Sequence, residues 1–153
     1  MNVMALSDIF ENSLQVQVRP DLILPVASLP GLIVLKLFAW LDRHEGRDVQ
    51  DIRRLIETYT DAGNIDRLYE EADELEWVDF DTVLAGAFLL DKDARHITDE
   101  KVRAQLLISL SWKEIGVLVH QLARTISVLD DHTVAVKALL GGFFRGMGLG
   151  DFM

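Results

Sequence analysis

The sequence predicts an α+β fold in which a small β-hairpin precedes a predominantly α-helical bundle. Apolar and polar residues alternate near the N-terminus, and apolar residues recur at helical spacing from residue 28 onward. No repeat, low-complexity stretch or linker composition interrupts the 153 residues. We therefore expect a single domain over residues 1–153, with a β-containing part at 1–27 and a helical region at 28–153.

The β-containing part is expected to open with a short helix over residues 5–12. Residues 14–18, Leu-Gln-Val-Gln-Val, then alternate with period two, as a half-buried strand does, and residues 22–26 are a second strand candidate. The Arg-Pro-Asp sequence at 19–21 has the composition of a turn, so the strands are predicted to pair as a hairpin. A lone hairpin is marginal in water, and we expect another element to cover it.

The helical region is expected to begin with Ser28 as N-cap and Pro30 in the first turn, and to run to about Arg43 before Gly46. Beyond Gly141 the chain is glycine-rich and is expected to fray. The remaining helices are predicted at about 48–60, 65–76, 81–95, 99–110 (with Thr98 as N-cap), 111–129 and 131–144.

Composition excludes several classes of protein. There are 25 acidic and 15 basic residues, a net charge of −10, so generic binding to nucleic acid is not expected. The absence of cysteine excludes disulfides and thiolate metal sites. The N-terminus lacks a signal-peptide pattern, and the longest apolar run, residues 29–41, falls short of the roughly 20 residues that cross a bilayer. We expect no membrane association and a cytoplasmic location.

A single lysine, Lys36, interrupts the apolar stretch LIVLKLFAWL. On a helix Lys36 shares a face with Arg43, seven residues later. The next predicted helix opens with Arg47 and places Asp48 and Asp51 on one face. Because helices joined by a short loop are usually neighbours, the two polar faces are expected to meet.

Two interpretations of this charged group remain open. In the structural one, Lys36 pairs with Asp48 or Asp51 and fixes the two helices, or extends its ammonium group to solvent. In the functional one, lysine and arginine hold the phosphates of a nucleotide while an aspartate orients them or acts as a base.

The segment VASLPGLIVLKLFAWLDRHEGRDVQDIRRLIETY resembles the pattern LKLxAWxxR, a short gap and (K/R)DxxD(L/I) of the AbiEii/AbiGii-like nucleotidyltransferases, many of which are toxins of toxin–antitoxin pairs. The resemblance covers about residues 1–95 and is strongest over 24–59. It implies a remnant of a nucleotidyltransferase fold at 1–27, and NTP and Mg²⁺ as cofactors. It further implies catalytic roles for Asp48 and Asp51 and phosphate binding by Lys36, Arg43 and Arg47.

One part of the family's pattern is missing. Its metal site is built on a Gly-Ser motif followed by an Asp-x-Asp pair on a strand, and this sequence has no Gly-Ser dipeptide. Asp79 and Asp81 imitate the pair but follow an acidic segment, so we expect them to begin a helix. We predict no metal ligands in this chain.

The N-terminal residues resemble an internal stretch of longer relatives, so we expect this chain to be a C-terminal half. The alternative function is a catalytically inactive module for partner binding or dimerisation. The partners expected are a second copy of the chain, a cognate antitoxin or an N-terminal half.

Overall fold

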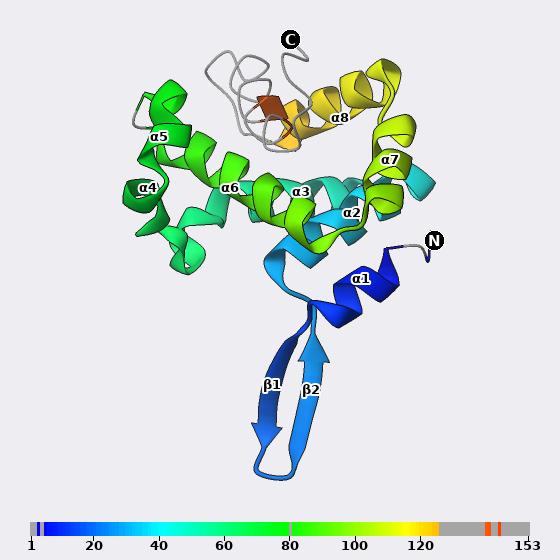
Figure 1. Cartoon of the computed structure of the whole chain (residues 1–153). Coiled ribbons are helices and arrows are strands. Elements are labelled where there is room, and N and C mark those ends of the chain that lie inside the picture. The colour runs from blue at the N-terminus through cyan, green and yellow to red at the C-terminus, as the bar shows by residue number, and fades with distance from the viewer. Residues whose placement is uncertain (1–2, 4, 80, 126–139, 142–143, 145–153) are drawn as a thin grey trace.

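A computed structural model describes residues 3, 5–79, 81–125, 140–141 and 144. The described chain forms a two-stranded antiparallel hairpin that extends from a body of helices (Figure 1), which confirms the predicted α+β fold. The elements are α1 (Leu6–Glu11), β1 (Leu14–Arg19), β2 (Leu22–Val26), α2 (Leu29–Arg43), α3 (Gly46–Thr58), the π-helical turn η1 (Thr60–Asn64), α4 (Arg67–Glu70), α5 (Ala72–Leu75), the 3₁₀ turn η2 (Glu76–Val78), α6 (Thr82–Ile97), α7 (Glu100–Ser109) and α8 (Trp112–Thr125).

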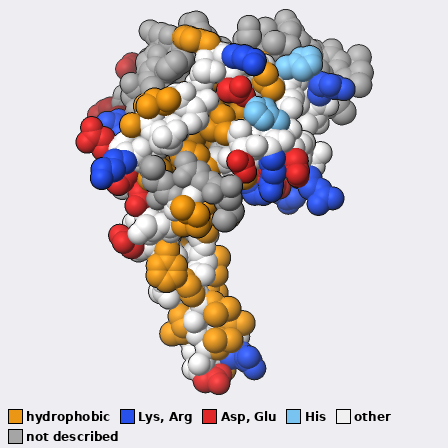
Figure 2. Space-filling view, turned by 90° about the vertical axis from the view of Figure 1, so that its right-hand side faces the viewer, with side chains coloured by type: hydrophobic (Ala, Val, Ile, Leu, Met, Phe, Trp, Pro, Cys, Tyr) orange, Lys and Arg blue, Asp and Glu red, His pale blue; other side chains and the backbone are white. Residues whose placement is uncertain are grey.

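The hairpin has one apolar face. Cross-strand partners share a face, and the pairs Leu14–Val26 and Val16–Leu24 place four apolar side chains together. All four are between 40% and 56% exposed, and apolar side chains cluster along the hairpin in Figure 2. No described element covers this face, so the cover that we expected for the hairpin is not found within the described residues.

Helix α2 begins and ends at identifiable signals. The Ser28 hydroxyl accepts a hydrogen bond from the Gly31 amide, proline occupies the first turn, and His44 ends the helix in the left-handed conformation. The helix is a 15-residue element whose buried side includes Ile33, Leu37 and Trp40. Burying these side chains against α3 and α6 supplies the apolar stabilisation of the body.

Helix α6 lies at the centre of the body, in contact with both α2 and α3. Its approach to η1 depends on Gly86. A Cβ atom at this position would lie 2.2 Å from the Thr60 hydroxyl oxygen and 3.2 Å from the Thr60 amide nitrogen. The Thr60 hydroxyl is held in place because it donates a hydrogen bond of 2.8 Å to the Thr82 carbonyl.

Two sequence predictions are corrected. Residues 65–76 do not form one helix: Glu71 leaves helical geometry (φ −109°, ψ 24°), and α4 and α5 are separate single turns. This break lets Arg67 and Glu71 pair with side chains of α6, so tertiary contacts override local helical propensity. The N-cap of α7 is Asp99 rather than Thr98, because the Asp99 carboxylate accepts from the Val102 amide while the Thr98 hydroxyl donates back to Ala94.

The other helices match their predictions to within a few residues. The predicted helix at 131–144, residues 126–129 of the preceding one and the glycine-rich tail lie almost entirely outside the described residues. Among the described helices, none has the length and apolar character that a bilayer crossing requires.

Replacing Gly86 tests the close contact between α6 and η1. We expect Gly86→Ala to lower the free energy of unfolding by about 3 kcal/mol, because the new methyl group overlaps Thr60. The matched control is Gly116→Ala in α8, where a Cβ meets nothing within 4 Å. That substitution should instead stabilise by about 0.5–1 kcal/mol. Denaturant titrations of both variants measure the difference, and equal stabilities would contradict the packing described here.

Candidate functional site

Four charged side chains form a seam between α2 and α3: Lys36, Arg43, Asp48 and Asp51. Asp48 lies in the first turn of α3 and is fully buried. Arg43 donates to its two oxygens, from Nε to Oδ2 at 2.7 Å and from Nη2 to Oδ1 at 2.8 Å. Lys36 Nζ lies 3.3 Å from the same Oδ1. One buried carboxylate therefore holds two cations, and the pairing of Lys36 with Asp48 is one that the structural interpretation of the sequence predicts.

Asp51 occupies the outer part of the seam. Its Oδ2 atom lies 2.5 Å from Lys36 Nζ, and its side chain is 49% exposed, against 30% for Lys36. The two aspartates thus differ in solvent exposure although they lie one turn apart on the same helix. Solvent reaches Asp51, whereas Asp48 is enclosed.

Arg47 is exposed beside the seam and is not joined to it. No hydrogen bond or ion pair links Arg47 to another residue in the described part of the chain. The structure therefore brings four of the five predicted site residues together. The fifth, Arg47, lies in the first turn of α3, directly before Asp48. Nothing in these contacts tests the catalytic or phosphate-binding roles, which stay predictions.

The charges of the seam reinforce one another. The hydrogen bonds from Arg43 hold the pKa of Asp48 below its usual value of 3.8, against the opposing effect of burial, and Lys36 acts in the same direction. The hydrogen bond with Asp51 raises the pKa of Lys36. Asp48, Arg43 and Lys36 are therefore ionised at neutral pH, and Asp48 is a weak proton acceptor.

Both cations have more N–H donors than the aspartates occupy, although Glu45 Oε2 also lies 3.8 Å from Arg43 Nε. A guanidinium group has five N–H donors, and Asp48 occupies two of those of Arg43, whose side chain is 48% exposed. An ammonium group has three, and the two aspartates engage two of those of Lys36. An oxyanion at the surface can therefore bind both cations without displacing Asp48.

The described residues contain no ready-made cluster of metal ligands. Among them, no three carboxylate or imidazole side chains converge as metal ligands would. Asp81 caps α6 by accepting from the Val83 and Leu84 amides, at 2.9 and 3.0 Å. The prediction that these aspartates begin a helix is confirmed for Asp81 and wrong for Asp79, which ends the 3₁₀ turn η2 in the left-handed conformation.

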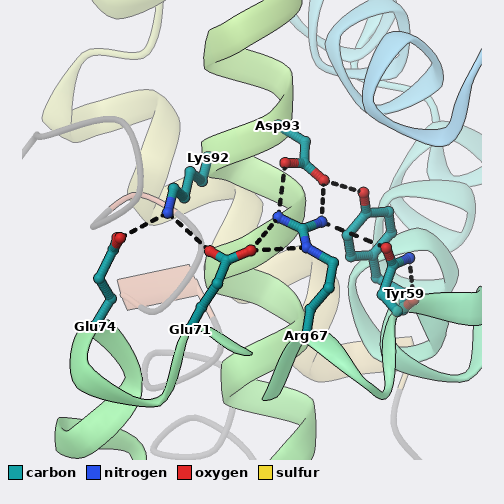
Figure 3. A network of polar contacts seen from close by, with 7 residues as sticks. Tyr59, Arg67, Glu71, Glu74, Lys92 and Asp93 are labelled. Atoms are coloured by element: carbon teal, nitrogen blue, oxygen red, sulfur yellow. Dashed lines mark hydrogen bonds and ion pairs between the residues drawn. The ribbon is translucent and has the colours of Figure 1, made fainter. Parts of the chain in front are cut away.

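A second polar cluster, which the sequence did not predict, joins η1, α4 and α5 to α6 (Figure 3). Arg67 forms a bidentate pair with Asp93 at 2.5 and 3.0 Å, and Tyr59 also donates to Asp93. Lys92 lies 2.7 Å from Glu71. The only signal in the sequence was the spacing of Arg67 and Glu71 at i and i+4, because their partners lie more than 20 residues away.

Removing the buried charge of the seam should cost more than removing the exposed one. We expect Asp48→Asn to lower the free energy of unfolding by about 3 kcal/mol, because two cations lose a buried partner. Asp51→Asn, the matched control on the same helix, should cost less than about 1 kcal/mol because its carboxylate is half exposed. Denaturant titration at neutral pH measures both, and similar losses would contradict the difference in burial.

The pH dependence of the Asp48→Asn effect follows from the lowered pKa. A carboxylate with a depressed pKa in the folded state stabilises fully above its unfolded value of about 3.8, and this stabilisation is lost as the pH falls through the folded pKa. The stability gap between wild type and Asp48→Asn should therefore be constant above about pH 5 and close below about pH 4. A stability gap that widens in acid would show that folding raises the pKa of Asp48 rather than lowering it.

Comparison with known proteins gives one family. The family model described as "Nucleotidyl transferase AbiEii toxin, Type IV TA system" matches residues 4–115, which include the hairpin, the seam and the helices through α7. No curated protein and no solved structure matches the chain. The match spans well over half of the sequence and extends beyond residue 95, where the resemblance noted in the sequence ended. This chain therefore belongs to the AbiEii family of nucleotidyl transferase toxins of type IV toxin–antitoxin systems.

Proposed function

We propose that this chain binds the phosphates of a nucleoside triphosphate at the outer edge of the seam, as part of the nucleotidyl transfer for which its family is named. The observation that supports this is the set of unused donors on Lys36 and Arg43, both fixed in position by the buried Asp48. Cations that are already ordered lose little conformational freedom when a phosphate binds. Arg47, which is exposed and unpaired among the described contacts, adds a third positive charge next to them.

Each seam residue has a separate part in this proposal. Asp48 is a positioning residue, because its two oxygens hold cations and solvent does not reach it. Asp51 is the accessible carboxylate, and it is the better candidate of the two for contact with the nucleotide or the acceptor. The proposed partner in the cell is a cognate antitoxin, and the proposed location is the cytoplasm.

Arg47 provides the sharpest test of nucleotide binding, because its replacement should leave the fold unchanged. We expect Arg47→Gln to weaken the binding of ATP, GTP, CTP or UTP about tenfold, because one charge-assisted hydrogen bond is lost. The melting temperature should not change. Calorimetric titration of each nucleotide, with Mg²⁺ and with EDTA, measures this effect. The control is Lys101→Gln, an exposed lysine of α7 without an ion pair among the described contacts.

Two results would contradict the proposal. One is a folded protein that binds none of the four nucleotides under either condition. The other is an equal loss of affinity in Arg47→Gln and Lys101→Gln, because that would indicate attraction to overall charge rather than a site at the seam.

A second candidate function is self-association through the hairpin. Four apolar side chains, Leu14, Val16, Leu24 and Val26, form a face that no described element covers. A two-stranded ribbon is marginal in water by itself, and a second copy can bury both apolar faces at once through a two-fold axis. The seam lies on α2 and α3, so such a dimer leaves it accessible.

Two substitutions on β1 distinguish the hairpin faces. We expect Val16→Lys to shift sedimentation from dimer to monomer, because the ammonium group enters the apolar face. Gln17→Lys places the same charge on the opposite face of the same strand and should leave the dimer intact. A wild-type protein that sediments as a monomer at micromolar concentration would refute this function.

A further inference from the structure

A cavity of about 410 Å³ lies between α4, α5 and the start of α6. Its walls are mainly apolar and include Leu68, Leu75, Val78 and Ala85. Tyr69 also lines the cavity, and its side chain is 81% exposed. The volume falls within the range of sites that accept small ligands or single side chains of a partner.

The rim of this cavity is acidic. Glu76, Asp79 and Asp81 line it, and the segment 66–81 contains eight acidic residues against one basic residue, Arg67. Arg67 faces inward and is occupied by Glu71 and Asp93. None of the three rim carboxylates pairs with a cation of the described chain. The mouth of an apolar cavity is thus lined by three carboxylates that no described cation neutralises, and of these Asp81 also caps α6.

The walls of the cavity are held in place although α4 and α5 are single turns. Arg67 fixes α4 to Asp93 of α6, and Lys92 of α6 fixes α5 through Glu71 at 2.7 Å and Glu74 at 2.8 Å (Figure 3). Burial raises the pKa of Tyr59, whose hydroxyl therefore stays protonated and donates to Asp93. The cavity is preorganised, so a ligand need not order it.

We propose that this acid-rimmed cavity is a docking site for a basic amphipathic segment of a partner protein. One leucine or aromatic side chain of the partner fills the cavity, and flanking lysine or arginine side chains contact Glu76 and Asp79. Charge complementarity selects this occupant: an acidic peptide or a nucleic acid is repelled by the rim, and a purely apolar segment leaves the carboxylates without partners. Nothing in this proposal depends on nucleotide binding at the seam.

The proposal is tested with the full chain and a panel of fluorescent peptides. Each peptide carries one central leucine, phenylalanine, tryptophan or methionine, flanked by lysine and arginine. Matched peptides carry serine at the centre, or glutamate in the flanks. We expect anisotropy titrations to show binding of at least one basic peptide below about 100 μM, weakened about tenfold or more by either change.

Substitutions in the chain test whether the peptides bind at this cavity. Ala72 is exposed and lines the cavity, so Ala72→Trp should fill it and abolish peptide binding, whereas Ala104→Trp on α7 should not. The double variant Glu76→Gln with Asp79→Asn should weaken binding about tenfold and reduce its salt dependence. Asn tolerates the left-handed backbone of Asp79, so the fold is kept. Asp21→Asn with Glu11→Gln removes two charges elsewhere and should have no effect.

Three outcomes overturn the proposal. The first is that no basic peptide of the panel binds to the folded protein below about 100 μM. The second is that basic and acidic peptides bind alike. The third is that Ala72→Trp, shown to be folded by circular dichroism, binds as well as Ala104→Trp, because the cavity is then not the docking site.

Discussion

The pairing of Asp48 with two cations is the interaction on which the arrangement of α2 and α3 depends. An ionised carboxylate without access to water is strongly unfavourable unless hydrogen bonds replace its hydration, and here Arg43 and Lys36 supply them. Apolar contact between two helices tolerates sliding, whereas three directional bonds to one buried group fix a single register. The same pairing explains why a lysine stands within an apolar stretch: its partner comes from the next helix.

Helix α3 is held in this way at both ends. Asp48 anchors its first turn to α2, and Tyr59, directly after its last residue, donates to Asp93 of α6. Between these two points, Val49, Ile52 and Ile56 are fully buried against the core. The seam and the acid-rimmed cavity are therefore supported by one rigid helix, but they share no residue. Their energetic effects should be nearly additive, as for distant sites without common partners.

Sequence patterns predicted most of the local structure because local signals determine it. Period-two alternation predicted the first strand, and the Ser28 cap with Pro30 predicted the start of α2. The seam was predicted in outline because its four residues lie within 16 positions of one another. The break at Glu71 was missed because it accompanies pairing with α6, whereas the cap at Asp99 was missed because Thr98 and Asp99 are both suitable N-cap residues. The network around Arg67 was missed for the same reason: Asp93 lies 26 residues away.

The seam also constrains how a phosphate can bind. A nucleotide that drew Arg43 or Lys36 away from Asp48 would leave a buried carboxylate unpaired, at a cost of several kcal/mol. Binding must therefore use the outer donors and leave the inner hydrogen bonds intact. Asp51 is the carboxylate that a phosphate can displace from Lys36, because it is half exposed and water can replace its bond to Lys36. A phosphate oxygen in its place would meet the Lys36 ammonium group, with which Asp51 pairs. The buried aspartate thus holds both cations in place, whereas the exposed one pairs with Lys36 alone.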